Sequence, residues 1–323
     1  MDGQLLITVN GSLRIAVLGC GYVGTAFALQ ALARGHTVLG VVRSEESCAR
    51  LRALGISAQA CDLQADDWTS LPTAFDVVVY AASTGGAGVD AYTRIYDLGV
   101  KRALAWAGGV GARHFIFTSS TGVYRQDDGS VVTEASEVGG TPTADAMLAG
   151  ERAVLTSGIA QATVLRFGGL YGPGRHYLLD QLKRGENVIG GRVVLYCNCL
   201  HREDAAGAIL AAAEIETRGA HLYNVTDGHP VTKADLAVWI SAQLHLPPPI
   251  FDADAPAGPR VRRSGQVQPS RIVDAGLIRH ELRWLPRFAG VFEGFRDFLS
   301  LTALAHVSAV WQAIHLFATL LSQ

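Results

Sequence analysis

Short apolar runs alternate with longer amphipathic stretches along the first half of the chain. The runs are rich in Val and lack polar alternation, whereas the stretches between them have helical spacing. Strands without alternating apolar and polar residues, separated by helices, are typical of a parallel sheet covered on both faces. Right-handed crossovers then place a ligand at the carboxyl ends of the strands. The predicted strands are Arg14–Leu18, Thr37–Val42, Phe75–Tyr80 and His114–Thr118, and the principal helices are Val23–Arg34 and Tyr92–Gly108.

The second half has a less regular pattern. It predicts a strand at Thr163–Phe167, helices at Arg202–Ala213 and Thr232–Leu244, and a surface loop from Pro247 to Arg263. We therefore predict an α/β fold, in which a Rossmann-type doubly wound parallel sheet carries a smaller C-terminal substrate lobe and an extra C-terminal helix. The expected divisions are a dinucleotide-binding domain at 1–165, an interwoven substrate lobe at 166–300 and the helix at 301–323.

The C-terminal stretch 298–323 contains no Asp, Glu, Lys or Arg, a composition that suits a membrane segment. Polar residues nevertheless recur in it at helical spacing, opposite an apolar face. A spanning helix has no need of a polar stripe, so we predict an amphipathic helix packed against protein, with membrane association as the alternative. The apolar face consists of Leu304, Val307, Trp311, Ile314 and Leu321.

Composition narrows the class of protein. Of the 323 residues, 49% are hydrophobic and only 17% charged, which predicts a sizeable core. The net charge of −2 argues against a nucleic-acid partner. Cys197 and Cys199 are too close together for a zinc-type pair, and no second pair exists, so no metal site is expected. Reduced thiols and the lack of a secretory pattern in the first residues indicate a cytoplasmic protein.

A glycine-rich motif, Gly-Cys-Gly-Tyr-Val-Gly, directly follows the first predicted strand and opens the first predicted helix. Gly19 permits the tight turn, Gly21 lets the backbone approach a pyrophosphate, and Gly24 lets helix and strand pack closely. The helix start offers free N–H groups to the phosphates. We therefore predict that these glycines, with Tyr22 and Val23, bind a dinucleotide.

The end of the second predicted strand bears on the choice of cofactor. NAD-selective sites usually have an acidic residue there, whereas this chain has Arg43 and Ser44. A guanidinium can bind the extra phosphate of NADP, so we expect NADP, with NAD as the alternative. The alternative is that Arg43 is only a solvated residue at the end of a strand and has no role in cofactor binding. Further cofactor contacts are expected after the next two strands, from Asp62 and Leu63 on the adenine and from Ala81, Ala82 and Ser83 on the ribose and phosphates.

Several blocks together resemble the extended short-chain dehydrogenase/reductases, NAD-dependent epimerase/dehydratases that act largely on nucleotide sugars. The resemblance covers about residues 13–300, and blocks in the same order are far more specific than any single one. It implies a small-molecule substrate and a homodimer. The matching blocks are GCGYVG at 19–24, CDL at 61–63, FTSSTGVY at 117–124, MLAGERAV at 147–154, VLRFGGLYGPGRH at 164–176 and LHREDAAGAI at 200–209.

The resemblance assigns a catalytic hydroxyl to Ser120 and places Ser119 against the cofactor. Tyr124 ends the same block and is a second catalytic candidate, although its ring suits packing equally well. The family's Tyr and Lys, four residues apart, are expected just before the LAGE segment, where this chain has Thr143 and Met147. Thr does not ionise near neutral pH and Met is only a weak acceptor, so neither replaces the usual acid–base pair.

The GPGRH loop approaches the substrate in the resembling proteins. Arg175 and His176 are therefore predicted to bind a phosphate or carboxylate, and His201 to line the substrate pocket. His176 and Tyr177 are also candidates for the missing acid. A purely structural role is an equal alternative for each.

These residues predict an NAD(P)-dependent oxidoreductase, epimerase or dehydratase-like enzyme with altered acid–base residues. Its substrate would be a nucleotide sugar or another small polar molecule. The alternative is a non-catalytic NAD(P)-binding sensor or scaffold, because one fold hosts many roles.

Overall fold

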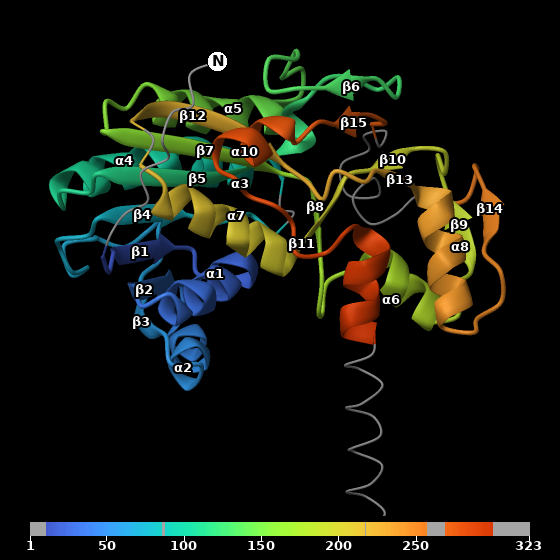
Figure 1. Ribbon diagram of the computed structural model, residues 1–323, viewed down its shortest axis with the longest axis horizontal. Coiled ribbons are helices and arrows are strands. Elements are labelled where there is room, and N and C mark those ends of the chain that lie inside the picture. The colour runs from blue at the N-terminus through green and yellow to red at the C-terminus, as the bar shows by residue number, and fades with distance from the viewer. Residues whose placement is uncertain (1–10, 86–87, 217, 257–268, 300–323) are drawn as a thin grey trace, which may run out of the picture.

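Seven parallel strands form the central sheet, in the order β12-β7-β5-β4-β1-β2-β3 (Figure 1). The structure, a computed structural model, describes residues 11–85, 88–216, 218–256 and 269–299. Strand order reverses between β1 and β4, at the kind of switch point where doubly wound sheets bind nucleotides. The predicted Rossmann-type sheet is therefore confirmed. Its strands are β1 (Arg14–Leu18), β2 (Thr37–Val42), β3 (Ser57–Ala60), β4 (Val77–Tyr80), β5 (His114–Ser120), β7 (Gln161–Phe167) and β12 (Gly219–Val225).

Helices cover both faces of this sheet, which explains the absence of polar alternation in its strands. Ile15 and Val17 of β1 belong to the core under α1 and α7, whereas Ala16 and Leu18 belong to the core under α4. Helix α5 lies on the same face as α4 (Figure 1). These helices are α1 (Tyr22–Ala33), α2 (Glu45–Ala53), α4 (Val100–Gly109), α5 (Pro142–Leu155), α7 (Arg202–Glu214) and α10 (Gly276–Glu281).

A smaller lobe lies beside the carboxyl ends of the strands (Figure 1). Its apolar cluster joins α6, α8 and a helix at 291–299. Between its segments the chain returns to the main sheet to form α7 and β12. The elements of this lobe are β8 (Gly169–Tyr171), α6 (Tyr177–Lys183), β9 (Val188–Gly190), β10 (Tyr196–Cys197), β11 (Cys199–His201), β13 (Val231–Thr232), α8 (Lys233–Gln243) and β14 (Ile250–Asp252).

The structure differs from the sequence pattern in three places. The stretch predicted as one helix is divided into α3 (Val89–Tyr92), a π-helical segment (Thr93–Gly99) and α4. The predicted loop after Pro247 contains β14, which pairs with β9. Strand β12 was not predicted, because its first four residues are exposed or half-buried and lack the apolar character of the other strands. A short parallel pair joins β6 (Val131–Val132) to β15 (Ile272–Val273).

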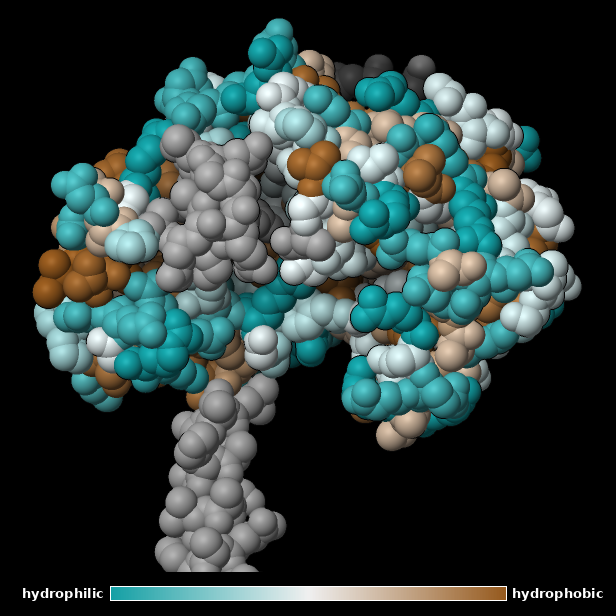
Figure 2. All heavy atoms as spheres, turned by 180° about the vertical axis from the view of Figure 1, so that it is seen from behind, coloured by the Kyte–Doolittle hydropathy of each residue, from teal (hydrophilic) through white to brown (hydrophobic). Residues whose placement is uncertain are grey.

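The predicted C-terminal helix at 301–323 lies outside the described residues. Among the helices that the structure describes, none is long and apolar enough to cross a membrane. Figure 2 shows described apolar side chains scattered among hydrophilic ones on the face opposite to Figure 1, as is ordinary for a protein surface.

Candidate functional site

The turn between β1 and α1 is shaped by its glycines. Gly19 has a φ of +83°, and a Cβ on it would lie 2.5 Å from the Cα of Ala82, two residues beyond β4. A Cβ on Gly24 would lie 3.1 Å from Cγ1 of Val17, so glycine allows helix and strand to pack closely. Gly21 has open space instead and precedes α1 without a side-chain cap. The turn therefore leaves room and free amide groups for a phosphate.

The other predicted cofactor residues lie along the same carboxyl edge. Arg43 is exposed and makes no hydrogen bond or ion pair with the described residues, whereas the Ser44 hydroxyl accepts from Ser47 N and caps α2. Asp62 is half-buried, and its Oδ1 accepts from Gln64 N at 3.0 Å. Ala81 and Ala82 are half-buried, Ser83 is exposed, and Val23 and Leu63 are buried.

The GPGRH loop of the smaller lobe packs onto the first residue of α1. The Tyr22 hydroxyl donates to Pro173 O at 3.3 Å. The guanidinium carbons of Arg175 and Arg202 both lie 5.2 Å from the Tyr22 ring centroid, a cation–π distance. A Cβ on Gly172 would lie 2.9 Å from Tyr22 Oη, so glycine permits this contact. The fold thus places Arg175, a predicted substrate ligand, directly beside the nucleotide turn.

Ser120 ends β5 and is half-buried. Its hydroxyl accepts from Gly122 N at 3.1 Å, within the 3₁₀ turn Thr121–Val123. Met147 of α5 is buried against Val123 and Tyr124, and a Cβ on Gly122 would lie 4.0 Å from its Cε. The turn beyond Ser120 is therefore covered by a thioether that can neither donate nor accept a proton near neutral pH.

Ser119 and Tyr124 take part in a buried polar network. The Ser119 hydroxyl donates to Glu151 at 2.6 Å, and Arg166 donates to the same carboxylate at 2.6 Å. Arg166 also donates to Tyr124 Oη, which donates to Asn224 at 2.7 Å. Burial raises the pKa of Tyr124 although Arg166 opposes the shift. Both hydroxyls are thus held by protein acceptors. Sequence patterns did not reveal the roles of Glu151, Arg166 and Asn224, because the three lie on different elements and meet only in the folded chain.

The two histidines predicted near the substrate both cap helices. His176 accepts from Leu179 N at 3.2 Å and packs edge-on against Phe295. His201 accepts from Glu203 N at 3.3 Å. Burial lowers the pKa of each to about 4, so both are neutral imidazoles at neutral pH. The half-buried Tyr177 stacks on His176, with ring centroids 5.9 Å apart.

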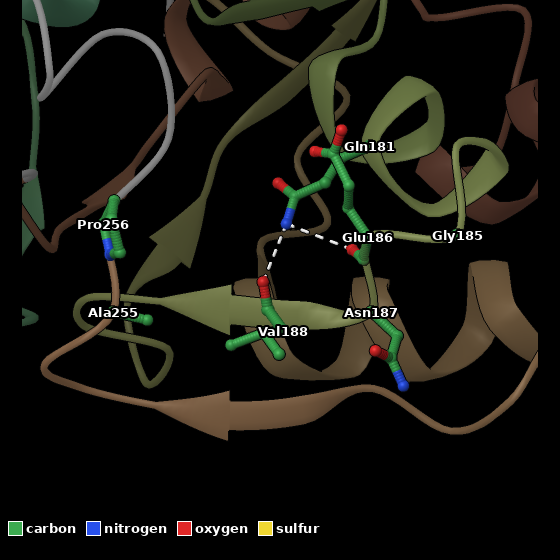
Figure 3. Close-up of a pocket in the computed structure, with 7 residues that line it drawn as sticks. All are labelled: Gln181, Gly185, Glu186, Asn187, Val188, Ala255 and Pro256. Carbon is green, nitrogen blue, oxygen red and sulfur yellow. Dashed lines mark hydrogen bonds between the residues drawn. The ribbon is translucent and has the colours of Figure 1, made fainter.

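A separate pocket lies in the smaller lobe (Figure 3). There Gln181 donates to the carbonyls of Glu186 and Val188, at 3.3 and 2.8 Å. No predicted site residue lines it. The carboxyl edge of the main sheet therefore remains the candidate site. The residues lining this pocket are Gln181, Gly185, Glu186, Asn187, Val188, Ala255 and Pro256.

Comparison with known proteins defines the class. The NAD(P)H-binding family matches residues 19–215, and the chain belongs to this family. The resemblance to extended short-chain dehydrogenase/reductases is likewise confirmed. The chain is 27% identical to Protein YeeZ of Escherichia coli (strain K12) over 279 residues, which is 83% of this chain and 94% of that protein. It is 34% identical to the 3-diazoavenalumate denitrifying reductase of a Streptomyces species over 129 residues, which is 38% of this chain and 41% of the reductase.

Solved structures show the same fold. MoeE5 in complex with UDP-glucose and NAD superimposes with a TM-score of 0.76 at 22% identity, over 91% of this chain and 99% of MoeE5. The UDP-glucuronic acid 4-epimerase of Bacillus cereus, in complex with UDP-glucuronic acid and NAD, gives a TM-score of 0.70 at 18% identity, over 85% of this chain and 94% of the epimerase.

Proposed function

We propose that this protein is an NADP(H)-dependent enzyme of the reductase, epimerase or dehydratase type, acting on a nucleotide sugar or another small polar substrate. The proposal is carried by one juxtaposition: the open glycine turn after β1 and the Ser120 hydroxyl at the end of β5 lie on the same carboxyl edge of the sheet. Known structures of this fold hold NAD together with UDP-sugars, which supports the substrate class.

The residues of this edge fit a dinucleotide. The turn at 19–24 would hold the pyrophosphate, and the nicotinamide would supply or accept a hydride when bound. Ser120 would donate a hydrogen bond to the reacting oxygen of the substrate. Thr143 and Met147 provide no proton, so we infer that the proton is exchanged with water or with a group of the substrate itself.

The cofactor preference is tested by titration calorimetry with NADPH and NADH. Arg43 is exposed and uses none of its donors on described residues, so we expect it to bind the extra phosphate and NADPH to bind more tightly. Arg43→Ala should remove the difference. Arg50→Ala is the matched control, because Arg50 pairs with Glu46 on the adjacent helix. Equal affinities in the unaltered protein would exclude the preference.

Catalysis is tested with UDP-glucose and UDP-glucuronic acid as first substrates. Ser120→Ala should lower turnover by about tenfold to a thousandfold, typical of losing one positioned donor. Unchanged turnover would remove Ser120 from the mechanism.

A non-catalytic dinucleotide sensor is the second candidate, favoured by the burial of Met147 where the family has its Lys. If the unaltered protein binds NADPH but turns over no substrate, and Thr143→Tyr with Met147→Lys creates activity, the sensor function is supported instead.

A further inference from the structure

Two arginines are buried near the carboxyl edge of the sheet, and they differ in their partners. Arg166 is 3% exposed and Arg271 is 5% exposed. Arg166 forms a two-pronged ion pair with Glu151, with contacts of 3.0 and 2.6 Å. Arg271 forms no ion pair with a carboxylate of the described residues. A buried charge without a counter-ion is costly, and such a group commonly has a functional reason to persist.

Arg271 is held against the turn that follows Ser120. Its Nη1 donates to Thr121 O at 3.3 Å and also to Tyr124 O. The side chain of Asn198 fixes the backbone around it, donating to Arg271 O at 2.9 Å and accepting from Val273 N at 2.8 Å. The guanidinium is therefore fixed against the backbone of the turn at Thr121–Tyr124, the turn that the Ser120 hydroxyl caps.

The other edge of this guanidinium has no partner among the residues that the structure describes. Nε and Nη2 donate to no described residue. Both atoms nevertheless keep some exposure to solvent. The acid that influences it most, Asp127, already accepts from Ser270 N at 2.8 Å and from Arg192 at 2.6 Å. Burial lowers the pKa of Arg271, which reflects a charge without full compensation. Nε and Nη2 form one side of the guanidinium fork, the geometry that fits two oxygens of an oxyanion.

We propose that Arg271 binds an anionic group of the substrate, a carboxylate or a phosphate, beside Ser120. This inference rests on the proposed function in taking the edge around Ser120 as the substrate site. It deepens that function by requiring an acidic substrate whose charged group lies close to the reacting carbon.

The test uses titration calorimetry on the full chain saturated with NADPH at low ionic strength. The probes are malonate for a carboxylate and inorganic pyrophosphate for a phosphate. We expect the unaltered protein to bind at least one of them and Arg271→Gln to weaken that binding about tenfold or more, as for loss of a charge-assisted pair. Arg271→Lys should give an intermediate loss, because it keeps the charge without the fork. The probe that binds identifies the chemistry.

Arg192→Gln is the matched control, because it removes a nearby positive charge that is exposed and already paired with Asp127. The affinity of Arg192→Gln for the anion probe should stay within about twofold of that of the unaltered protein, since exposed ion pairs contribute little. Three results would overturn the proposal: no binding of either probe, unchanged binding in Arg271→Gln, or an equal loss in Arg192→Gln.

Two further measurements keep these outcomes interpretable. If Arg271→Gln does not fold, Arg271→Lys replaces it in the titrations. A crystal of the unaltered protein is then also soaked with pyrophosphate and malonate. An anion that binds away from Nε and Nη2 of Arg271 counts against the proposal. The titrations are repeated without NADPH. Failure of the protein to bind NADPH refutes the proposed function, whereas normal NADPH binding with anion binding independent of Arg271 refutes this inference alone.

Discussion

At the scale of single residues, the glycine turn combines two different steric requirements. Gly19 is confined by the backbone at Ala82, whereas Gly21 faces open space. We therefore expect the same residue type to serve folding at Gly19 and ligand approach at Gly21.

These requirements predict opposite phenotypes for two matched variants. Gly19→Ala should lower the free energy of unfolding by about 1–3 kcal/mol, because its positive φ and the 2.5 Å approach to Ala82 both strain a Cβ. Gly21→Ala should leave stability nearly unchanged and weaken NADPH binding, because the new methyl group enters the phosphate space. Urea unfolding and calorimetry measure the two effects. Similar losses of stability in both variants would contradict this division of roles.

A site residue can be predicted from the sequence when its role depends on a local sequence pattern. The glycine turn is recognisable because the role proposed for it depends on six consecutive residues. The network of Glu151, Arg166 and Asn224 and the position of Arg271 depend instead on contacts between different elements of the fold. The periodicity of hydrophobic residues does not indicate such contacts. The glycine turn could therefore be predicted from the sequence, whereas these buried polar contacts could not.

At the scale of elements, two buried carboxyl groups fix the segment that leads into the last described helix. Asp204 of α7 accepts from Arg287 N at 2.6 Å and from Phe288 N. Asp227, after β12, accepts from His229 N at 2.9 Å and from Val291 N. Burial raises the pKa of each to about 6, and the nearby charge of Asp227 adds to the increase at Asp204.

These raised pKa values predict an unusual pH dependence. A carboxyl with a folded pKa of about 6 and an unfolded value near 3.8 stabilises the fold below about pH 4 and loses that contribution as the pH rises through 6. Asp204→Asn keeps a side-chain oxygen that can accept from Arg287 N but removes the titrating carboxyl group. The unaltered protein should therefore lose about 2 kcal/mol relative to Asp204→Asn between pH 4 and 7, as followed by urea unfolding.

The buried histidines contribute a second pH dependence, which the comparison with Asp204→Asn removes. Burial lowers the pKa of His176 and His201, so their contribution has the opposite sign and falls as the pH drops below about 6.5. Both proteins contain these histidines, so their effect cancels in the difference. A difference that is constant with pH would show that Asp204 does not titrate in this range.

At the scale of the whole molecule, the two lobes share their chain segments. Helix α7 packs against α1, and β12 pairs with β7, although both elements follow residues of the smaller lobe. The Tyr22 contact with the GPGRH loop joins the lobes again at the site. Sequence periodicity showed where the early strands lie, but it missed β12, whose position depends on pairing with β7.

This shared architecture predicts how truncation acts. A chain that ends after Phe167 lacks α7 and β12, so the apolar face of α1 and the edge of β7 become exposed. We expect it to aggregate and to bind no NADPH. A chain that ends after Leu299 keeps every described element and should bind NADPH normally. Light scattering and calorimetry compare the two, and a soluble, NADPH-binding short form would show that the first half folds alone.

The late position of β12 also matters while the protein is being made. A nascent chain leaving the ribosome has β7 available before its partner strand β12 is translated, because the first elements of the smaller lobe, β8 to β11, and helix α7 are synthesised in between. During that interval the open strand edge can pair with a neighbouring polypeptide. We infer that the rate of translation between β7 and β12, and the shielding of this edge by chaperones, govern the yield of folded protein in the cell.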